Sequence, residues 1–441
     1  MTIATPAAMA VSEDRARTTQ QRRVAFSCFL GTAIEYYDFT LYGLLAPSVF
    51  DRLFFPGLAG TILGTIVVLS VYFVGFIGRP LGGLIFGWYG DRIGRKPTMV
   101  ISMTVMGLAS TAMGLLPSYA SIGAAAPILL ICLRVLQGFA LGGESSGALV
   151  LSTETASAGK RGFFVSLVQS GIFVAWILAV GAATAVALLP QDQFLSWGWR
   201  LPFIASIALV SVGIYMRLKV EESAVFLKAV STRAPARVPL LEVFRHAKKS
   251  AIITILCAMA ESSSGFFFLV FAYSYALRNL HIDRATLLQA MLIANIAGFF
   301  MAPLFGRLSD RIGRRATIGG AYALNALYVV FAFFPMLSSG NTFLVYLAMF
   351  LPIAFTAPMS VCIVGSFYPE LFPDARMRFS GVGLGRQVGT ALGGGLMPVV
   401  ATSLVAALGG SLAGAIAYFA AICVVAIAAL IAAPETKDVA V

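Results

Sequence analysis

The chain has 441 residues, of which 59% are hydrophobic and only 11% are charged, whereas soluble domains carry roughly 25% charged residues. The hydrophobic residues fall into stretches of about 20, which is long enough to cross a bilayer and favours a multi-span membrane protein over soluble domains. A net charge of +12 would suggest nucleic acid as a partner of a soluble protein, but the location of these charges argues against that.

In chain order, the sequence predicts an all-α membrane protein with about twelve spans in two six-helix bundles. Residues 1–20 are polar and small and predict a disordered segment within a cytoplasmic N-terminal tail, residues 1–23. The first bundle is expected at 24–217, a cytoplasmic linker at 218–249, the second bundle at 250–433 and a cytoplasmic tail at 434–441. The spans are expected to begin near Val24, Thr61, Thr98, Pro127, Phe163, Leu201, Ala251, Ala285, Ala316, Thr342, Phe379 and Ser411.

The linker is the one long hydrophilic connection. Its piece from Pro239 to Lys249 forms either a short amphipathic helix on the inner membrane surface or a solvated tether between the bundles.

Basic residues are distributed unevenly between the loops. With the N-terminus inside, 24 of the 31 Lys and Arg residues lie on the cytoplasmic side, and four lie outside. The remaining three, Arg79, Arg134 and Arg386, lie within membrane stretches. Because positive residues accumulate on the cytoplasmic side of membrane proteins, both termini are predicted to be cytoplasmic.

A charged hairpin occurs twice, at Gly87 to Lys96 and at Gly306 to Arg315. Their aspartates, Asp91 and Asp310, stand 219 positions apart, about half of the chain, which indicates a duplicated bundle. In such a hairpin the aspartate accepts hydrogen bonds from helix-start N–H groups. A second pair of patterns, with a glutamate before an arginine, recurs 216 positions apart. The predicted cytoplasmic gate comprises Asp91, Arg92, Arg95, Glu154, Arg161, Asp310, Arg311, Arg314, Glu370 and Arg376; the alternative is that these charges only anchor the topology.

Ionisable residues inside the membrane are candidate functional groups because they are costly to bury. Glu35 and Asp38 are three positions apart, so both carboxylates share one helix face and suit proton binding. Arg134 presents a planar guanidinium that suits a carboxylate from the substrate. The alternatives are that one acid only pairs with a structural arginine, and that Arg134 and Asp38 form a permanent pair.

The second half supplies further candidates for substrate binding. Arg386 and Gln387 lie beside a glycine stripe, Glu261 begins a polar run, and Gln169 of the first half offers a neutral hydrogen bond. Together with Arg134, Arg386 suits an anionic substrate held at the membrane midplane. Alternatively, Arg386 and Glu261 pair across the bundle as a structural or gating bridge.

Enzymatic chemistry has no evident residues in this sequence. The five cysteines lie in apolar spans without a C-x-x-C pair, and the histidines, His246 and His281, lie in loops. No nucleophile motif or nucleotide-binding loop is present. The protein is therefore expected to be neither an enzyme nor a metal protein, and to need no cofactor beyond a proton gradient.

The repeated hairpin resembles the G-x-x-x-D-R-x-G-R-[K/R] signature of the major facilitator superfamily. The run from Glu35 to Gly43, the segment from Arg79 to Gly83, the segment from Arg134 to Glu144 and the segment from Tyr368 to Pro373 resemble its metabolite:proton symporter family. This resemblance implies twelve helices, alternating access and a bacterial inner-membrane location. It adds Tyr42 and Gln137 to the substrate-binding candidates. The chain departs from that family at Arg386, where its members usually carry tyrosine.

These observations predict a monomeric symporter that imports a small carboxylate or zwitterion together with protons across the lipid bilayer. In this hypothesis, protonation of Asp38 or Glu35 frees Arg134 for the substrate carboxylate. The alternatives are a proton-driven efflux antiporter of hydrophobic drugs, which would be expected to have fewer buried arginines, and a non-transporting nutrient sensor, which usually carries long cytoplasmic tails.

Overall fold

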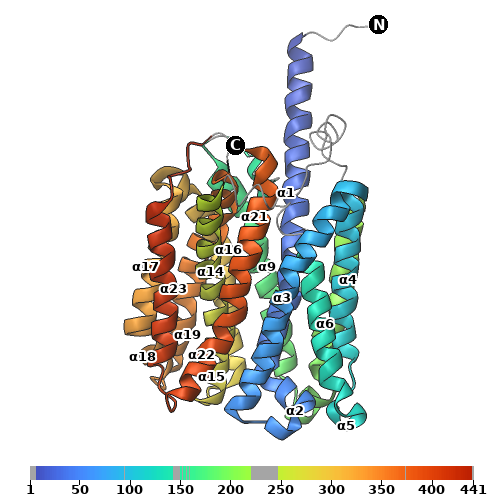
Figure 1. Ribbon diagram of the computed structural model, residues 1–441, viewed down its shortest axis with the longest axis vertical. Helices are drawn as coiled ribbons and strands as arrows, with labels where there is room; N and C mark the ends of the chain where they lie inside the picture. Colours follow the sequence, from blue (N-terminus) through green and yellow to red (C-terminus); the bar gives the residue numbers. More distant parts are fainter. Residues whose placement is uncertain are drawn as a thin grey trace.

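The computed structural model describes residues 6–93, 95–142, 149–150, 152–154, 156–157, 159–219, 247–372 and 374–439. These residues form helices and connecting turns without any strand. The helices run lengthwise through two bundles that lie side by side (Figure 1). The predicted fold class, an all-helical membrane protein of two bundles, is confirmed.

The first bundle comprises six long helical segments, of which the fifth is divided between two helices. They are α1 (Pro6–Leu45), α3 (Ile62–Ile93), α4 (Arg95–Leu115), α6 (Ala125–Gly142), α8 (Arg161–Gln169) with α9 (Gly171–Ala187), and α11 (Arg200–Lys219). Short helices α2 (Asp51–Phe54), α5 (Tyr119–Ile122) and α10 (Gln191–Gln193) lie at one end of this bundle.

The second bundle repeats this plan, with π-helical turns inside four of its spans. Its helices are α14 (Lys248–Phe266) with α15 (Tyr273–Arg278), α16 (Arg284–Ile312), α17 (Arg314–Tyr328) with α18 (Phe334–Leu337), α19 (Thr342–Leu351) with α20 (Val364–Glu370), α21 (Ala375–Thr390) with α22 (Leu396–Ala407), and α23 (Ala413–Ala432).

Most of these segments are long and apolar enough to span a membrane. Among the described residues, ten helices meet this condition, and an eleventh span is the pair Gln191–Gly198 and Arg200–Tyr215, bent by 41°. The remaining predicted span corresponds to α1, whose hydropathy is lowered by Glu35, Tyr36, Tyr37 and Asp38. The protein is therefore a multi-pass membrane protein.

The N-terminal segment differs from the prediction of disorder for residues 1–20. Helix α1 already begins at Pro6 and projects beyond both bundles (Figure 1). The reason is local: proline suits the first helical turn, and alanine, arginine and glutamine, which are frequent here, are strong helix formers. The predicted linker lies between α11 and α14, but its residues 220–246 lie outside the described part of the chain.

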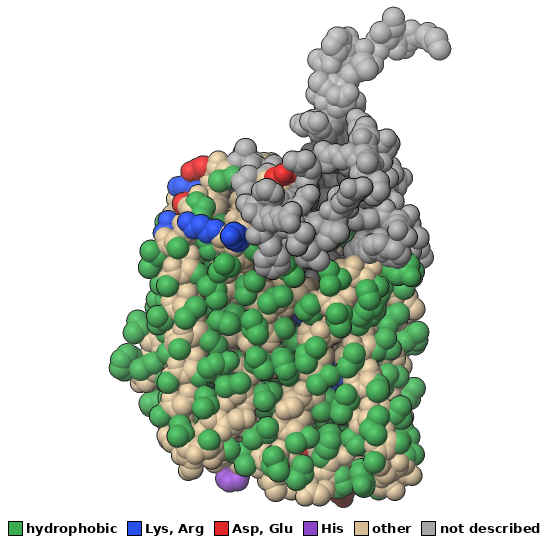
Figure 2. All heavy atoms as spheres, in the orientation of Figure 1, with side chains coloured by type: hydrophobic (Ala, Val, Ile, Leu, Met, Phe, Trp, Pro, Cys, Tyr) green, Lys and Arg blue, Asp and Glu red, His purple; other side chains and the backbone are tan. Residues whose placement is uncertain are grey.

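The two ends of the bundles differ in charge. We call the end at which α1 begins and the chain leaves α23 the terminal face, and the end that carries α2, α5, α15 and α18 the distal face. Figure 2 shows hydrophobic side chains along the length of the bundles and charged side chains at the terminal face. This distribution fits a protein whose sides contact lipid.

Contacts between the bundles follow two lines of helices. Helices α8 and α9 of the first bundle pack against α16, and α3 packs against α21 and α22. Close approach requires small residues here: a Cβ added at Gly306 of α16 would lie 2.7 Å from the carbonyl oxygen of Gly162 in α8. The candidate functional residues lie along this interface and inside the first bundle.

Candidate functional site

Asp38 of α1 is buried at the centre of a chain of hydrogen bonds within the first bundle. Its carboxylate accepts a hydrogen bond of 2.6 Å from the hydroxyl of Ser110 in α4 and another from Ser206 in α11. The hydroxyl of Ser110 in turn accepts from Nε2 of Gln137 at 2.7 Å, and Oε1 of Gln137 accepts from Nη1 of Arg134. The alternative of a direct Arg134–Asp38 pair is wrong for this structure, because Gln137 and Ser110 lie between them.

Aromatic rings surround the guanidinium of Arg134, which is fully buried. Its carbon Cζ lies 4.0 Å from the ring centre of Tyr42, 4.4 Å from that of Phe39 and 5.2 Å from that of Tyr72. Nη2 also donates to the backbone carbonyl of Tyr72 at 3.3 Å. The negative faces of the rings attract the cation, so Arg134 is stabilised here without a carboxylate in contact.

Two glycines make room for this arrangement. A Cβ at Gly75 of α3 would lie 3.1 Å from both Nη2 of Arg134 and Cζ of Phe39. Gly138 of α6 packs so closely on the backbone of Gly75 that any added Cβ would collide with its carbonyl group. The side chain of Arg134 reaches the rings because these two helix backbones touch.

A second group of polar residues lies where the two bundles meet. Nη2 of Arg386 in α21 donates a hydrogen bond of 2.8 Å to the hydroxyl of Tyr36 in α1, and thereby joins the bundles. Glu261 of α14 accepts from the hydroxyl of Tyr368 at 3.3 Å. The charges of Glu261 and Glu35 act on Arg386, but no direct hydrogen bond or ion pair joins Arg386 to Glu261, both of which are described. In this structure the two charges therefore interact at a distance, without the direct contact of the predicted bridge.

Arg79 of α3 also belongs to this group, although it was not among the site residues predicted from the sequence. Its Cζ lies 4.2 Å from the ring centre of Phe39 and 4.8 Å from that of Phe76. It interacts electrostatically with Glu35 and Arg386. The available signal was that Arg79 is one of the three arginines within membrane stretches. The other residues that were missed, Tyr36, Ser110, Ser206 and Tyr368, carried no comparable signal.

Four buried polar atoms of the candidate residues lack a hydrogen-bond partner in the part of the chain that the structure describes. They are Nε2 of Gln169, Oε1 of Gln387, the hydroxyl of Tyr42 and Nε of Arg134. Buried polar groups are almost always hydrogen-bonded, so such atoms mark places where a polar solute or water would be stabilised. All four residues were candidates for substrate binding in the sequence.

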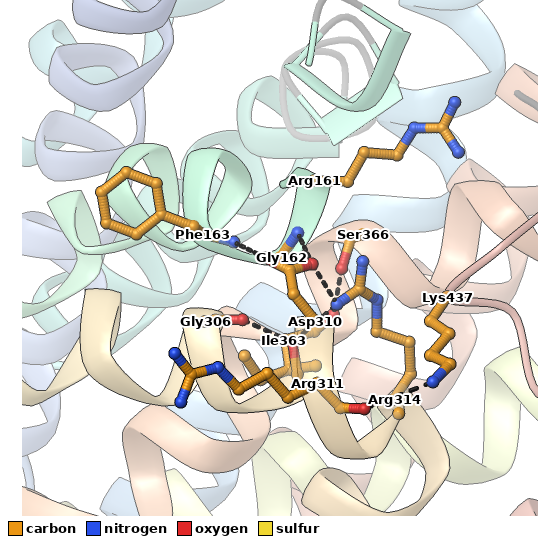
Figure 3. Close-up of polar contacts among 12 residues, drawn as sticks. Arg161, Gly162, Phe163, Gly306, Asp310, Arg311, Arg314, Ile363, Ser366 and Lys437 are labelled. Atoms are coloured by element: carbon orange, nitrogen blue, oxygen red, sulfur yellow. Dashed lines mark hydrogen bonds and ion pairs between the residues drawn. The ribbon is translucent and has the colours of Figure 1, made fainter. Parts of the chain in front are cut away.

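At the terminal face, Asp310 of α16 joins the bundles by hydrogen bonds. Its carboxylate accepts from the backbone N–H of Gly162 at 2.8 Å and of Phe163 at 2.9 Å, at the start of α8 (Figure 3). Nη1 of Arg314 donates to the same carboxylate at 2.8 Å. The prediction that the hairpin aspartate accepts hydrogen bonds from helix-start N–H groups is thus confirmed for Asp310. The helix that donates them, α8, lies in the other bundle.

Two glutamates of the terminal face, Glu154 and Glu370, pair with arginines that are distant in the sequence. Glu154 pairs with Arg378 across the bundles at 2.8 Å, and Glu370 pairs with the buried Arg314 at 3.4 Å. Arg161 donates to the backbone carbonyl of Val439. In this structure Glu154 and Arg161 therefore contact the second bundle and not each other. The side chains of Asp91, Arg92, Arg95 and Arg376 lie outside the described part of the structure.

The segment after α23 is attached to the same face. Glu435 accepts from the backbone N–H of Arg314 at 2.8 Å and of Arg315 at 3.2 Å, at the start of α17. The hydroxyl of Thr436 donates to Glu370 at 2.6 Å, and Nζ of Lys437 donates to the carbonyl of Arg311 at 3.2 Å. Together with Arg161, this segment links both bundles.

The distal face is bridged as well. Nη2 of Arg278 in α15 contacts Oδ2 of Asp51 in α2 at 2.7 Å. Arg284 of α16 donates to the carbonyl of Ala187 at 2.9 Å. Contacts between the bundles are thus present at both the terminal and the distal face. The charged residues in the middle of the molecule lie between these two sets of contacts.

Two helical bundles that enclose buried charges and that meet through polar contacts at both faces define a membrane transporter. The chain belongs to the Major Facilitator Superfamily, whose family model matches residues 28–394.

Known transporters are similar over nearly the whole chain. The "Shikimate transporter" of Escherichia coli is 36% identical over 410 residues, which cover 92% of this chain and 93% of that protein. The "Proline/betaine transporter" of Salmonella typhimurium is 32% identical over 395 residues, covering 87% of this chain and 78% of that protein. The crystal structure of a D-xylose-proton symporter has the same fold, with a TM-score of 0.72 at 18% identity, covering 94% of this chain and 98% of that one.

Proposed function

We propose that the protein is a proton-coupled symporter that imports a small carboxylate or zwitterionic metabolite by alternating access. The observation that carries this proposal is the buried chain from Asp38 through Ser110 and Gln137 to Arg134. It connects an acid able to take a proton with a buried cation, Arg134, whose ring partner Phe39 also contacts Arg79 where the bundles meet.

The proton would act on Asp38, with Glu35 three residues before it as a second acceptor. Protonation removes the negative charge that the Ser110 and Ser206 hydroxyls stabilise. Ser110 then loses its charged acceptor, and its bond to Gln137 is no longer fixed in direction. Through Gln137 this change reaches Arg134, so proton binding alters the position of the cation without direct contact.

The substrate would bind between the bundles, where Arg386 and Arg79 face Glu261 and Glu35. A carboxylate accepts from Arg386 in place of the Tyr36 hydroxyl, which is a neutral and weaker acceptor. A cationic group of a zwitterion faces the two glutamates. The names of the relatives, for shikimate and for proline and betaine, support a small carboxylate or zwitterion as the substrate class.

The two faces would then open alternately. At the terminal face, the gate consists of Asp310, Arg314, Glu370, Arg161 and Glu154, with Arg311, Asp91, Arg92, Arg95 and Arg376 as further candidates from the duplicated patterns. The excess of Lys and Arg in the loops of this face supports its placement in the cytoplasm, with both termini inside. A bacterial inner-membrane location and a monomeric state complete the proposal.

Transport in proteoliposomes tests the function. Shikimate, proline and glycine betaine are offered under an imposed pH gradient while internal pH is recorded. We expect one of these classes to carry protons inward, and Asp38→Asn to abolish uphill accumulation. Asp192→Asn, the same change at an exposed acid of the distal face, serves as the matched control. Normal proton-driven accumulation in both Asp38→Asn and Glu35→Gln would overturn the proton site, and hydrophobic cations that drive protons outward would favour efflux.

A further inference from the structure

A small pocket opens at the distal face between the start of α3, α15 and α22. Its volume is about 120 Å³, well below the roughly 300–1,000 Å³ of a pocket for a drug-sized ligand, so it suits only the carboxylate end of a small solute. Among the described residues that line it, none is acidic. Its polar lining consists of hydroxyl groups, one amide and one guanidinium, from Thr61, Thr65, Ser274, Tyr275, Thr402, Asn279 and Arg278. The threonine hydroxyls donate to backbone carbonyls, so the donors left for an anion are those of Ser274, Tyr275, Asn279 and Arg278.

Arg278 uses only part of its guanidinium in the cross-bundle contact. Nη2 donates both to Oδ2 of Asp51, at 2.7 Å, and to the carbonyl of Pro47. Nε is buried and has no hydrogen-bond partner among the described residues. The contact with Asp51 is therefore single, and Nε has no acceptor of its own among the described residues.

Asp51 does not depend on Arg278 alone, although its side chain is almost completely buried. Oδ1 accepts from the backbone N–H of Arg52 at 2.9 Å, and Oδ2 accepts from that of Gly60 at 3.1 Å. A buried carboxylate left without partners would be very costly. These two N–H groups keep Asp51 hydrogen-bonded after Arg278 leaves, which lowers the cost of exchange.

We propose that this pocket is an outer loading site for the carboxylate group of an incoming solute. This carboxylate replaces Asp51 as the partner of Arg278. The incoming carboxylate bonds to Nε and Nη2 together, and this paired geometry is stronger than the single contact it replaces. Because Arg278 belongs to the second bundle and Asp51 to the first, the exchange releases the distal cross-bundle pair. Arrival of the solute thus favours opening of the distal face. The proposal rests on the proposed function as a carrier of carboxylates or zwitterions.

The test measures opening of the distal face directly, without transport. Spin labels are placed at Ser121→Cys in α5 and at Ser339→Cys after α18, both exposed, after replacement of Cys132, the exposed native cysteine. Distances between the labels are recorded in nanodiscs with sodium acetate and with sodium chloride at equal ionic strength. We expect acetate to raise the long-distance population about threefold or more, as preferential binding to one state requires.

Three variants separate this site from the central one. Arg278→Gln is expected to lose the acetate response and to show a raised long-distance population in chloride. Ser274→Ala leaves the Arg278–Asp51 pair intact and should weaken the response without changing the distribution in chloride. Arg386→Lys, which alters the central site, should leave the response unchanged.

An acetate response that is absent in the otherwise unchanged chain, or that persists in Arg278→Gln, would overturn the loading site. Loss of the response in Arg386→Lys would assign the effect to the central site, and this result would also overturn the loading site. A normal response in a protein that transports none of the offered solutes would reject the proposed function while supporting the loading site.

Discussion

Glu154 of the first bundle and Arg378 of α21 form an ion pair in which Oε1 and Nη1 are 2.8 Å apart. Arg378 is also fixed by a hydrogen bond of 3.1 Å from Nε to the carbonyl of Phe372. The same helix carries Arg386, which contacts Tyr36 of the first bundle. One helix therefore holds both a contact of the terminal face and a contact of the central site, so that a displacement of α21 would change both.

Glu154→Gln is expected to open the terminal face. An ion pair with one partly exposed partner contributes about 0.5–1 kcal/mol, so its loss should raise the open population about two- to fivefold. The reaction of a thiol reagent with Ser366→Cys, buried near this face, measures that population. The exchanged pair Glu154→Arg with Arg378→Glu should restore the slow reaction. An unchanged rate in Glu154→Gln would show that the pair does not hold the face closed.

Thr436→Val is expected to weaken the attachment of the segment after α23. The Thr436 hydroxyl donates to Glu370 at 2.6 Å, and Glu370 otherwise has Arg314 at 3.4 Å. Loss of this bond removes about 1 kcal/mol of the free energy of unfolding. Thermal unfolding in detergent measures the effect, and Thr436→Ser, which keeps the hydroxyl, should behave like the original chain. Equal losses in both variants would point to packing of the Thr436 methyl group instead.

The duplicated hairpin and the length of the apolar stretches were enough to predict two bundles and the buried charges Asp38, Arg134, Glu261 and Arg386. These features depend on local composition and on spacing, both of which are visible in the chain. The sequence also predicted the role of Asp310 as an acceptor of helix-start N–H groups. It did not show that the helix would be α8 of the other bundle.

The partners of these charges were not predictable, because they depend on how the two bundles meet. Glu154 has Arg161 seven positions away, yet its partner is Arg378, which lies 224 positions away. Ser110 and Ser206 bind Asp38, but many other serines in these helices bond to the carbonyl four residues earlier, as Ser70 and Ser264 do. Nothing in the sequence distinguishes the two kinds of serine. Likewise, Tyr42 and Phe39 resemble ordinary core residues until Arg134 is placed between them.

Gly138→Ala is expected to destabilise the protein and to displace Arg134. The added Cβ would collide with the backbone of Gly75, and Gly75 in turn borders the guanidinium of Arg134. Overpacking of this kind costs about 1–3 kcal/mol. Gly181→Ala is the matched control, since its Cβ would meet only Cδ1 of Leu292 at 4.0 Å. Thermal unfolding should show a lower midpoint for Gly138→Ala only, and equal midpoints would contradict the close contact of α3 and α6.

Arg386→Lys is expected to weaken substrate binding far more than Tyr36→Phe does. Lysine keeps the charge but loses the planar pair of donors that holds a carboxylate, so the KM of the transported solute should rise about tenfold or more. Tyr36→Phe removes only the neutral acceptor that the substrate would replace, and it should leave the KM unchanged or lower it. Arg52→Lys, at an exposed arginine of the distal face, controls for the substitution itself. Because α21 links Arg386 to the Glu154 contact, slow reaction of Ser366→Cys in the Arg386→Lys background would show that the helix keeps its position. An unchanged KM in Arg386→Lys would remove Arg386 from the substrate site and leave Arg134 or Arg79 as the cation that binds the carboxylate.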